Sequence, residues 1–263
     1  MDHGNRCSGI RSLILFFSDL HIDPLRPDEL RQKILIRFLN QLKGVEKIFL
    51  VGDVFDFWFE YRYMVPSGYI HILDAFAELI NRGIEINFIK GNHDQWAGSS
   101  LSSTGINVYD QKQDFECYGI KIHLAHGDFL DRTVPNQLTQ FFFKSKICRS
   151  LFGHIPHEIG FPIACHIAQR NRNFKLKNAL IKAFDEYARE KIAHGSDIVI
   201  MGHLHYPIMK RTGKGVYVNI GDWVKNMTYL VLKKDELFLK KYLDENLSCC
   251  KIERHSERRL VCQ

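Results

Sequence analysis

Five short motifs in the chain combine aspartate, asparagine and histidine, whose oxygen and imidazole nitrogen atoms bind divalent metal ions. In chain order the motifs are Asp19-Leu20-His21, Gly52-Asp53-Val54-Phe55-Asp56, Gly91-Asn92-His93-Asp94, His126-Gly127-Asp128 and Gly202-His203-Leu204-His205. Because none contains cysteine, the chemistry favours manganese, iron, zinc or magnesium over thiolate-bound metals. Each motif alone arises often by chance. The ordered set supplies about the right number of ligands for two ions, with the Asp53 carboxylate as the natural bridge.

The elements around the motifs explain how they can meet at one place. Apolar runs typical of strands end directly before them, at Leu13–Phe17, Lys47–Val51, Ile84–Ile89, Lys121–Ala125 and Asp197–Met201. Helical spacing of apolar residues over 28–42 and 69–80 separates the first three runs, which predicts parallel strands with helices on the faces of a sheet. Since the carboxyl ends of parallel strands share one edge, the motifs should converge there.

The composition describes an ordinary globular protein of 263 residues, with 45% apolar and 25% charged residues. A net charge of +6 suits an anionic partner, such as a phosphorylated substrate or an anionic membrane face, and equally suits solubility alone. Seven cysteines without a C-x-x-C pair argue against a disulfide framework and favour a reducing compartment. With neither a secretory signal nor a run of about 20 apolar residues, we expect a soluble or peripheral cytoplasmic protein.

The motif order D-x-H, G-D-x-x-D, G-N-H-D, H-G-D, G-H-x-H resembles the calcineurin-like metallophosphoesterases over roughly residues 13–233. This resemblance implies an α/β fold of four layers, in which two packed mixed β-sheets are flanked by helices and carry a helical cap insertion. It also implies two metal sites. Their ligands would be Asp19, His21, Asp53 and His205 for one ion, and Asp53, Asn92, His126 and His203 for the other.

The same resemblance implies a mechanism. Two ions would clamp phosphoryl oxygens and activate a bridging water, which attacks phosphorus in line. His93 would be the catalytic histidine, stabilising the developing charge or protonating the leaving oxygen, with Asp94 as its orienting partner. Asp56 is expected to orient a metal ligand rather than to bind metal itself.

A finer resemblance concerns the substrate. The run from Gly52 to Tyr61, the segment Asn219-Ile220-Gly221-Asp222-Trp223 and the helical insertion resemble the UDP-2,3-diacylglucosamine diphosphatase branch. This implies hydrolysis of that pyrophosphate to UMP and 2,3-diacylglucosamine 1-phosphate in lipid A synthesis, usually with Mn²⁺. The implied partners are a lipid-linked nucleotide and the anionic cytoplasmic face of the inner membrane, and no nucleic acid. The best-known members have arginine at the position of His93, so the match is to a histidine-bearing variant.

The insertion, about residues 134–194, is helical, aromatic and basic. Its apolar residues suit an acyl-chain groove and its basic residues a diphosphate or a membrane face; alternatively, they form the core and the solvated face of the cap itself. We expect one domain over residues 1–243 and a polar tail over 244–263. The residues proposed to touch substrate are Trp58, Phe142, Arg149, Arg170, Arg172, Asn219, Asp222 and Trp223.

Three rival functions use the same motifs. A nuclease would be expected to present a basic, aromatic groove along the metal site, whereas this insertion mixes basic and apolar residues. A phosphatase or phosphodiesterase of another substrate shares the metal core, because a fold does not fix a substrate. A non-catalytic scaffold is disfavoured because the ligand set is complete and His93 is present.

Overall fold

Two mixed β-sheets form the centre of the molecule in the computed structural model, which describes residues 13–26, 29–60, 66–133, 137, 140–142, 145–171 (168–171 by backbone only), 178–234 and 236–242. The first sheet has the order β11-β10-β1-β2-β3-β4. Its strands are β1 Leu13–Phe17, β2 Val45–Val51, β3 Glu85–Ile89, β4 Asn107–Tyr109, β10 Thr228–Lys233 and β11 Glu236–Lys241. The second sheet has the order β5-β6-β7-β9-β8. Its strands are β5 Lys112–Cys117, β6 Ile120–Ala125, β7 Ile198–Met201, β8 Ile208–Thr212 and β9 Gly215–Asn219.

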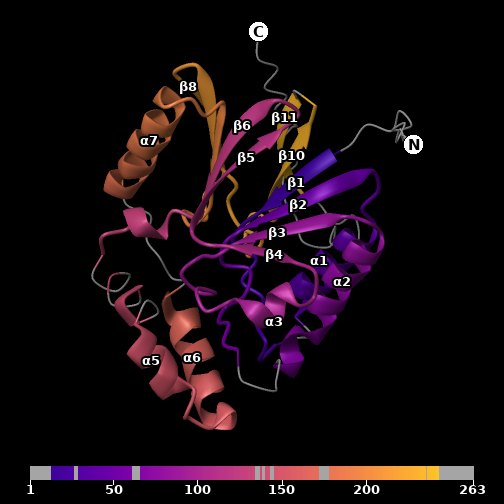
Figure 1. The fold of residues 1–263 in the computed structure, drawn as a ribbon, viewed down its shortest axis with the longest axis vertical. Coiled ribbons are helices and arrows are strands. Elements are labelled where there is room, and N and C mark those ends of the chain that lie inside the picture. Colours follow the sequence, from indigo (N-terminus) through magenta and orange to yellow (C-terminus); the bar gives the residue numbers. More distant parts are fainter. Residues whose placement is uncertain are drawn as a thin grey trace, which may run out of the picture.

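The pairing of the strands brings the motif-bearing ends together. β1 to β4 run parallel in the first sheet, and β6, β7 and β9 run parallel in the second. The two sheets face each other, and their strands converge toward the middle of the molecule in Figure 1. The carboxyl ends of β1, β2, β3, β6 and β7, each followed by one motif, therefore meet at one edge, as the sequence predicted.

Alternation of side chains along each strand builds the layers. In β1, Ile14 and Phe16 face the second sheet, and the ring of Phe16 stacks on Phe49 of β2 at 5.0 Å between centroids. Leu15 and Phe17 point the other way, toward the helices α1 (Leu30–Asn40) and α2 (Ile70–Asn81). The chain is thus an α/β fold of four layers, with two mixed sheets flanked by helices, as expected.

One boundary of the expected insertion is wrong. Helix α7 (Asn178–Ala193) lies within the predicted range 134–194, but it covers the outer face of the second sheet. There Phe184 and Ala188 pack with Tyr217 of β9. The part that stands apart in Figure 1 is α5 (Lys146–Phe152) and α6 (His157–Asn171), which we call the cap helices. The start of the insertion and the tail over 244–263 lie outside the described residues.

The cap helices pack through aromatic contacts against the loop that follows β2. Phe152 and Phe161 are buried, and both pack on the ring of Phe57, at 5.4 Å and 5.7 Å between centroids. Most other described apolar side chains between residues 141 and 167 are exposed, so they do not form a core of the cap. The exposed side chains are Phe141, Phe142, Ile147, Leu151, Ile155, Ile159, Ile163 and Ile167. Among the described helices, none is both long and apolar enough to cross a bilayer.

Candidate metal centre and catalytic site

The loop after β1 presents the first two candidate ligands. Asp19 and His21 are fully buried, and their backbone N–H groups donate to the carbonyls of Gly52 and Asp53 in the loop after β2. From α1, the buried guanidinium of Arg31 donates to the carbonyls of Leu20 and His21. These bonds hold the two loops against each other, so the side chains of both enter the same space. Arg31 had no sequence signal, because its contacts depend on how α1 packs.

Backbone strain concentrates at this centre. Eight described residues other than glycine have positive φ, and five of them are the candidate ligands Asp19, His21, Asp53, His203 and His205. Such conformations cost on the order of 1 kcal/mol or more for residues with a Cβ and persist where the surroundings enforce them. Strain gathered on one set of polar side chains points to a functional site.

The candidate ligand atoms form three overlapping groups, one of which, His21, Asp53 and His93, shares a residue with each of the other two. Of those two, the first is Asp19, His21 and His205, and the second is Asp53, His126 and His203; within each, the ligand atoms all lie within 4.8 Å of one another. Nε2 of His205 is 3.3 Å from Oδ1 of Asp19. Nε2 of His126 is 3.2 Å from Oδ2 of Asp53, and that same oxygen is 4.0 Å from Nε2 of His21. Asp53 therefore stands between both groups, where a bridging carboxylate belongs.

Buried polar atoms show that these residues fit divalent cations. Oδ1 of Asp19, Oδ1 of Asn92 and Nε2 of His126 are buried without a hydrogen bond within the described part of the chain. Buried polar atoms nearly always have a partner, and a metal ion supplies one. Asn92 follows Gly91, whose Cα lies close against Asp53, so Asn92 enters the same loop cluster.

The charges at the centre are unbalanced without cations. Burial, together with the nearby Asp53 carboxylate, raises the pKa of Asp19 to about 8 against the opposing effect of His126. The pKa of Asp53 lies well below its usual range despite burial, because His126 and His93 stabilise its negative charge. Burial lowers the pKa of His205 to about 4, which keeps its imidazole neutral and able to bind metal.

His93 lies beside the shared carboxylate. Its Nε2 is 3.9 Å from Oδ2 of Asp53, and its backbone N–H donates to Oδ1 of Asp53 at 2.9 Å. Its Nδ1 is 2.9 Å from the backbone carbonyl of Asp56. A carbonyl only accepts, so Nδ1 carries the proton that it donates, and Nε2 is the atom directed at the centre.

The role expected for Asp94 is corrected by its contacts. Its carboxylate accepts from the backbone N–H groups of Gly91 and Val54, both at 2.7 Å, and does not orient His93. Asp94 therefore ties the loop after β3 to the loop after β2. The orienting contact on His93 comes instead from the carbonyl of Asp56.

Other carboxylates and carbonyls lie near ring nitrogens of the candidate ligand histidines. Oδ1 of Asp56 is 3.1 Å from Nδ1 of His21, as expected for a residue that orients a ligand. The carbonyl of Val51 is 3.0 Å from Nδ1 of His126. Oδ2 of Asp222 lies 3.7 Å from Nδ1 of His205. Asp131, another residue without a sequence signal, has Oδ2 3.6 Å from Nε2 of His203.

The segment Asn219–Trp223 supports the metal loops rather than an open surface. The amide of Asn219 donates to the carbonyl of Gly202, directly before His203. The backbone N–H of Trp223 donates to the carbonyl of Asp19 at 3.1 Å, and its indole is fully buried against Phe17. Asn219, Asp222 and Trp223, three of the residues proposed to touch substrate, thus contact the loops that carry the candidate ligands.

The remaining candidate substrate residues separate into buried and exposed. Trp58 is 2% exposed and packs on Phe55 and Tyr69, so it belongs to the core. Phe142 is 38% exposed, with its ring 5.4 Å from Trp96. The side chain of Arg149 is half exposed and lies 4.0 Å from Glu60. The side chains of Arg170 and Arg172 lie outside the described residues.

Comparison with known proteins identifies the family. The sequence profile of the calcineurin-like phosphoesterases matches residues 12–207, a range that contains all five motifs. The chain belongs to the calcineurin-like phosphoesterases. As a member of this family it is a hydrolase, and the divalent ions that the family uses agree with the donor set described above.

Relatives of this calcineurin-like phosphoesterase have been named for one substrate. The UDP-2,3-diacylglucosamine hydrolase of Porphyromonas gingivalis is 30% identical over 264 residues, covering 89% of this chain and 99% of that protein. The enzyme of the same name from Aeromonas salmonicida is 30% identical over 235 residues, covering 84% and 90%. Among solved structures, the phosphoesterase Yfce from E. coli aligns with a TM-score of 0.42 at 15% identity, covering 86% of this chain and 91% of that one.

Proposed function

We propose that the chain hydrolyses the pyrophosphate bond of UDP-2,3-diacylglucosamine, giving UMP and 2,3-diacylglucosamine 1-phosphate for lipid A synthesis. The observation that carries this proposal is the joint presence of the metal centre and an exposed apolar cap on one chain. Hydrolysis of a pyrophosphate requires the metal centre, and binding of two acyl chains requires the apolar surface of the cap. The relatives named for this substrate match nearly their whole length, which supports the same assignment.

Two divalent ions, for which we propose Mn²⁺, would polarise phosphoryl oxygens and lower the pKa of a shared water to near neutrality. One ion would be held by Asp19, His21, Asp53 and His205, and the other by Asp53, Asn92, His126 and His203. The donor set supports this division, because the group Asp19, His21 and His205 and the group Asp53, His126 and His203 are linked by a third group that contains both His21 and Asp53.

His93 would act on the leaving oxygen. With Nδ1 donating to the Asp56 carbonyl, a second proton on Nε2 makes an imidazolium that faces the centre. That Nε2–H can donate to a phosphoryl oxygen as negative charge develops, or transfer its proton to the departing phosphate.

The cap helices would hold the acyl chains and rest on the cytoplasmic face of the inner membrane. Ile147, Leu151, Ile155, Ile159 and Ile163 recur every four residues and are each more than 40% exposed. A soluble protein rarely exposes so many large apolar side chains in one short region unless they meet a lipid or a partner. Each buried methylene contributes about 0.8 kcal/mol, so partial burial of two chains separates acylated from deacylated substrate by orders of magnitude.

A comparison of substrates tests this proposal. Purified protein with Mn²⁺ is incubated with UDP-2,3-diacylglucosamine, deacylated UDP-glucosamine, bis-p-nitrophenyl phosphate and single-stranded DNA, and kcat/KM is compared. We expect the acylated nucleotide to be preferred by orders of magnitude. Equal turnover of acylated and deacylated nucleotide would leave a phosphodiesterase of another substrate, and preference for DNA would make it a nuclease.

A pair of matched variants isolates the cap. Leu151 on α5 is 64% exposed and Leu30 on α1 is 59% exposed, so aspartate is accepted at both without disturbing the core. Leu151→Asp should reduce the preference for acylated substrate while sparing the small diester, and Leu30→Asp should leave both unchanged. Equal effects of the two variants would show that the cap does not select for the acyl chains. Thermal melts of both variants exclude unfolding as the cause.

A further inference from the structure

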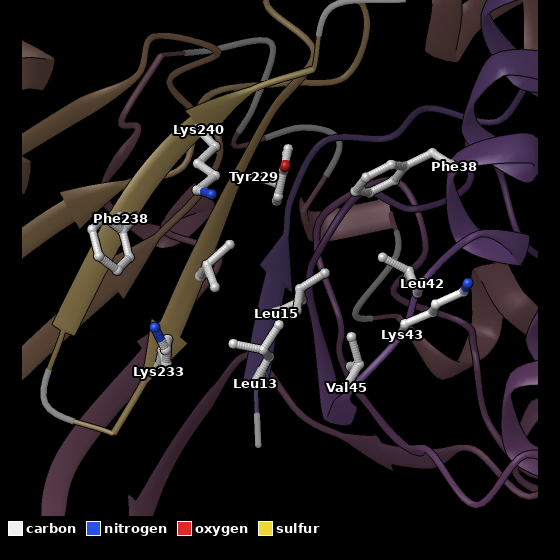
Figure 2. A pocket seen from close by; sticks show the side chains of 11 residues that line it. Leu13, Leu15, Phe38, Leu42, Lys43, Val45, Tyr229, Lys233, Phe238 and Lys240 are labelled. Atoms are coloured by element: carbon white, nitrogen blue, oxygen red, sulfur yellow. The ribbon is translucent and has the colours of Figure 1, made fainter. Parts of the chain in front are cut away.

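A groove opens on the helical side of the first sheet, away from the metal centre. It has a volume of about 490 Å³ and lies between the β10–β11 hairpin and the end of α1. Its floor includes Leu13 and Leu15 of β1, with Phe38 of α1 on one wall, as Figure 2 shows. Asp19 is six residues from Leu13 and four residues from Leu15 along the chain, so the floor of the groove lies roughly 13 to 20 Å from the first ligand loop.

The charged residues of the groove all have the same sign. Lys233 and Lys240 line it from the hairpin and Lys43 lines it from the loop after α1, and none of the described residues that line it is acidic. Figure 2 shows the two sets of lysines on opposite sides of the apolar floor. Lys43 and Lys240 are exposed, whereas Lys233 is 3.7 Å from Glu236, outside the groove. Two of the three ammonium groups are therefore well placed to bind an added anion.

We infer that this groove binds a long-chain fatty acid, with its chain over Leu13, Leu15 and Phe38 and its carboxylate at one of the two flanking ammonium groups, Lys43 or Lys240. The volume lies within the range of about 300–1,000 Å³ typical of small-molecule sites. The apolar floor favours an alkyl chain and the lysines at its edges favour an anionic group, and a fatty acid provides both. This site goes beyond the proposed function, because it is remote from the centre where that reaction would occur.

A nearby tryptophan makes occupancy measurable. Phe38 and Tyr229 both line the groove, and their rings lie 5.5 Å and 6.4 Å from Trp223 between centroids. Trp223 is fully buried behind them. A heavy atom on a chain in the groove should therefore quench the fluorescence of Trp223.

Titration of the full-length protein tests the inference. The probe is a bromine-labelled dodecanoate, with decanoate, dodecanoate and tetradecanoate followed by calorimetry below their micellar concentrations. We expect saturable quenching with one site per chain, and an affinity that tightens about fourfold for each added methylene. Dodecanol, which lacks the charge, should bind at least tenfold more weakly. Absence of saturable binding, or affinity independent of chain length, overturns the inference.

Charge variants locate the site. Lys43→Glu combined with Lys240→Glu should weaken dodecanoate binding at least tenfold. Lys241→Glu, an equally exposed change on the same strand but outside the groove, should leave it unchanged. Leu151→Asp on the cap should also leave it unchanged, and loss of binding there would assign the fatty acid to the cap instead. If sedimentation shows a dimer that the double variant dissociates, the groove is an interface between copies and the inference fails.

Discussion

Gly91→Ala should disable the metal centre through a single methyl group. A Cβ at this position would lie 2.2 Å from Oδ1 of Asp53 and 2.5 Å from its backbone nitrogen. Ordinary contact begins near 3.4 Å, so the shared carboxylate must move by about 1.2 Å. The same oxygen accepts the backbone N–H of His93, so the displacement also disturbs the catalytic loop. A misplacement of about 1 Å at reacting groups costs about 100-fold in rate.

Two measurements check this prediction. Hydrolysis of bis-p-nitrophenyl phosphate should fall about 100-fold in kcat, and the metal content per chain should fall in the same preparation. Gly153→Ala is the matched control, because its Cβ would make only ordinary contact at 3.4 Å from Ser150. It should retain activity and metal. If Gly91→Ala keeps both ions and activity within about twofold of wild type, Asp53 is not the bridge that this reasoning requires.

Three further predictions concern neighbouring groups. His93→Ala should keep the metal content but lower turnover about 100-fold, and a change of less than about fivefold would make His93 structural. Asp56→Ala should weaken metal binding about 10- to 100-fold, because Nδ1 of His21 loses its partner; unchanged metal affinity would contradict that role. Without metal, the pKa of Asp19 is raised to about 8. Burial lowers the pKa of His126, but the Asp53 carboxylate outweighs this and raises it well above its usual value. Both groups therefore hold protons at neutral pH. Metal binding should therefore release protons and tighten as pH rises toward 8, whereas calorimetry that shows no proton release would refute this.

Much of the fold follows from local patterns. The runs at Leu13–Phe17 and Lys121–Ala125 predicted β1 and nearly all of β6, because a buried strand is a continuous apolar run. β8 (Ile208–Thr212) had no such signal, since it is an edge strand with two exposed basic residues in its middle. The extent of the insertion was wrong for another reason. α7 is amphipathic like any cap helix, and only the position of the second sheet decides what it covers.

The candidate metal ligands could be proposed from the sequence because residue type and strand ends single them out. The residues that orient those ligands were not predictable. Arg31 and the carbonyl of Asp56 act through contacts that depend on packing between distant segments. Asp94 shows the same limit, because adjacency in sequence suggested a partner for His93, whereas its side chain turns back to the loop backbone. For Trp58 and Trp223 likewise, the sequence does not distinguish a ring buried in the core from one that contacts a substrate, and both rings are buried.

Reconstitution of metal-free protein tests the central claim most directly. Chelator-treated wild type and Asp53→Ala are titrated with Mn²⁺, and bound metal and hydrolysis of UDP-2,3-diacylglucosamine are followed together. We expect wild-type activity to rise until two ions are bound per chain, and Asp53→Ala to lose most activity and at least one ion. Full activity at fewer than two ions, or undiminished activity in Asp53→Ala, would contradict a centre in which two ions share that carboxylate.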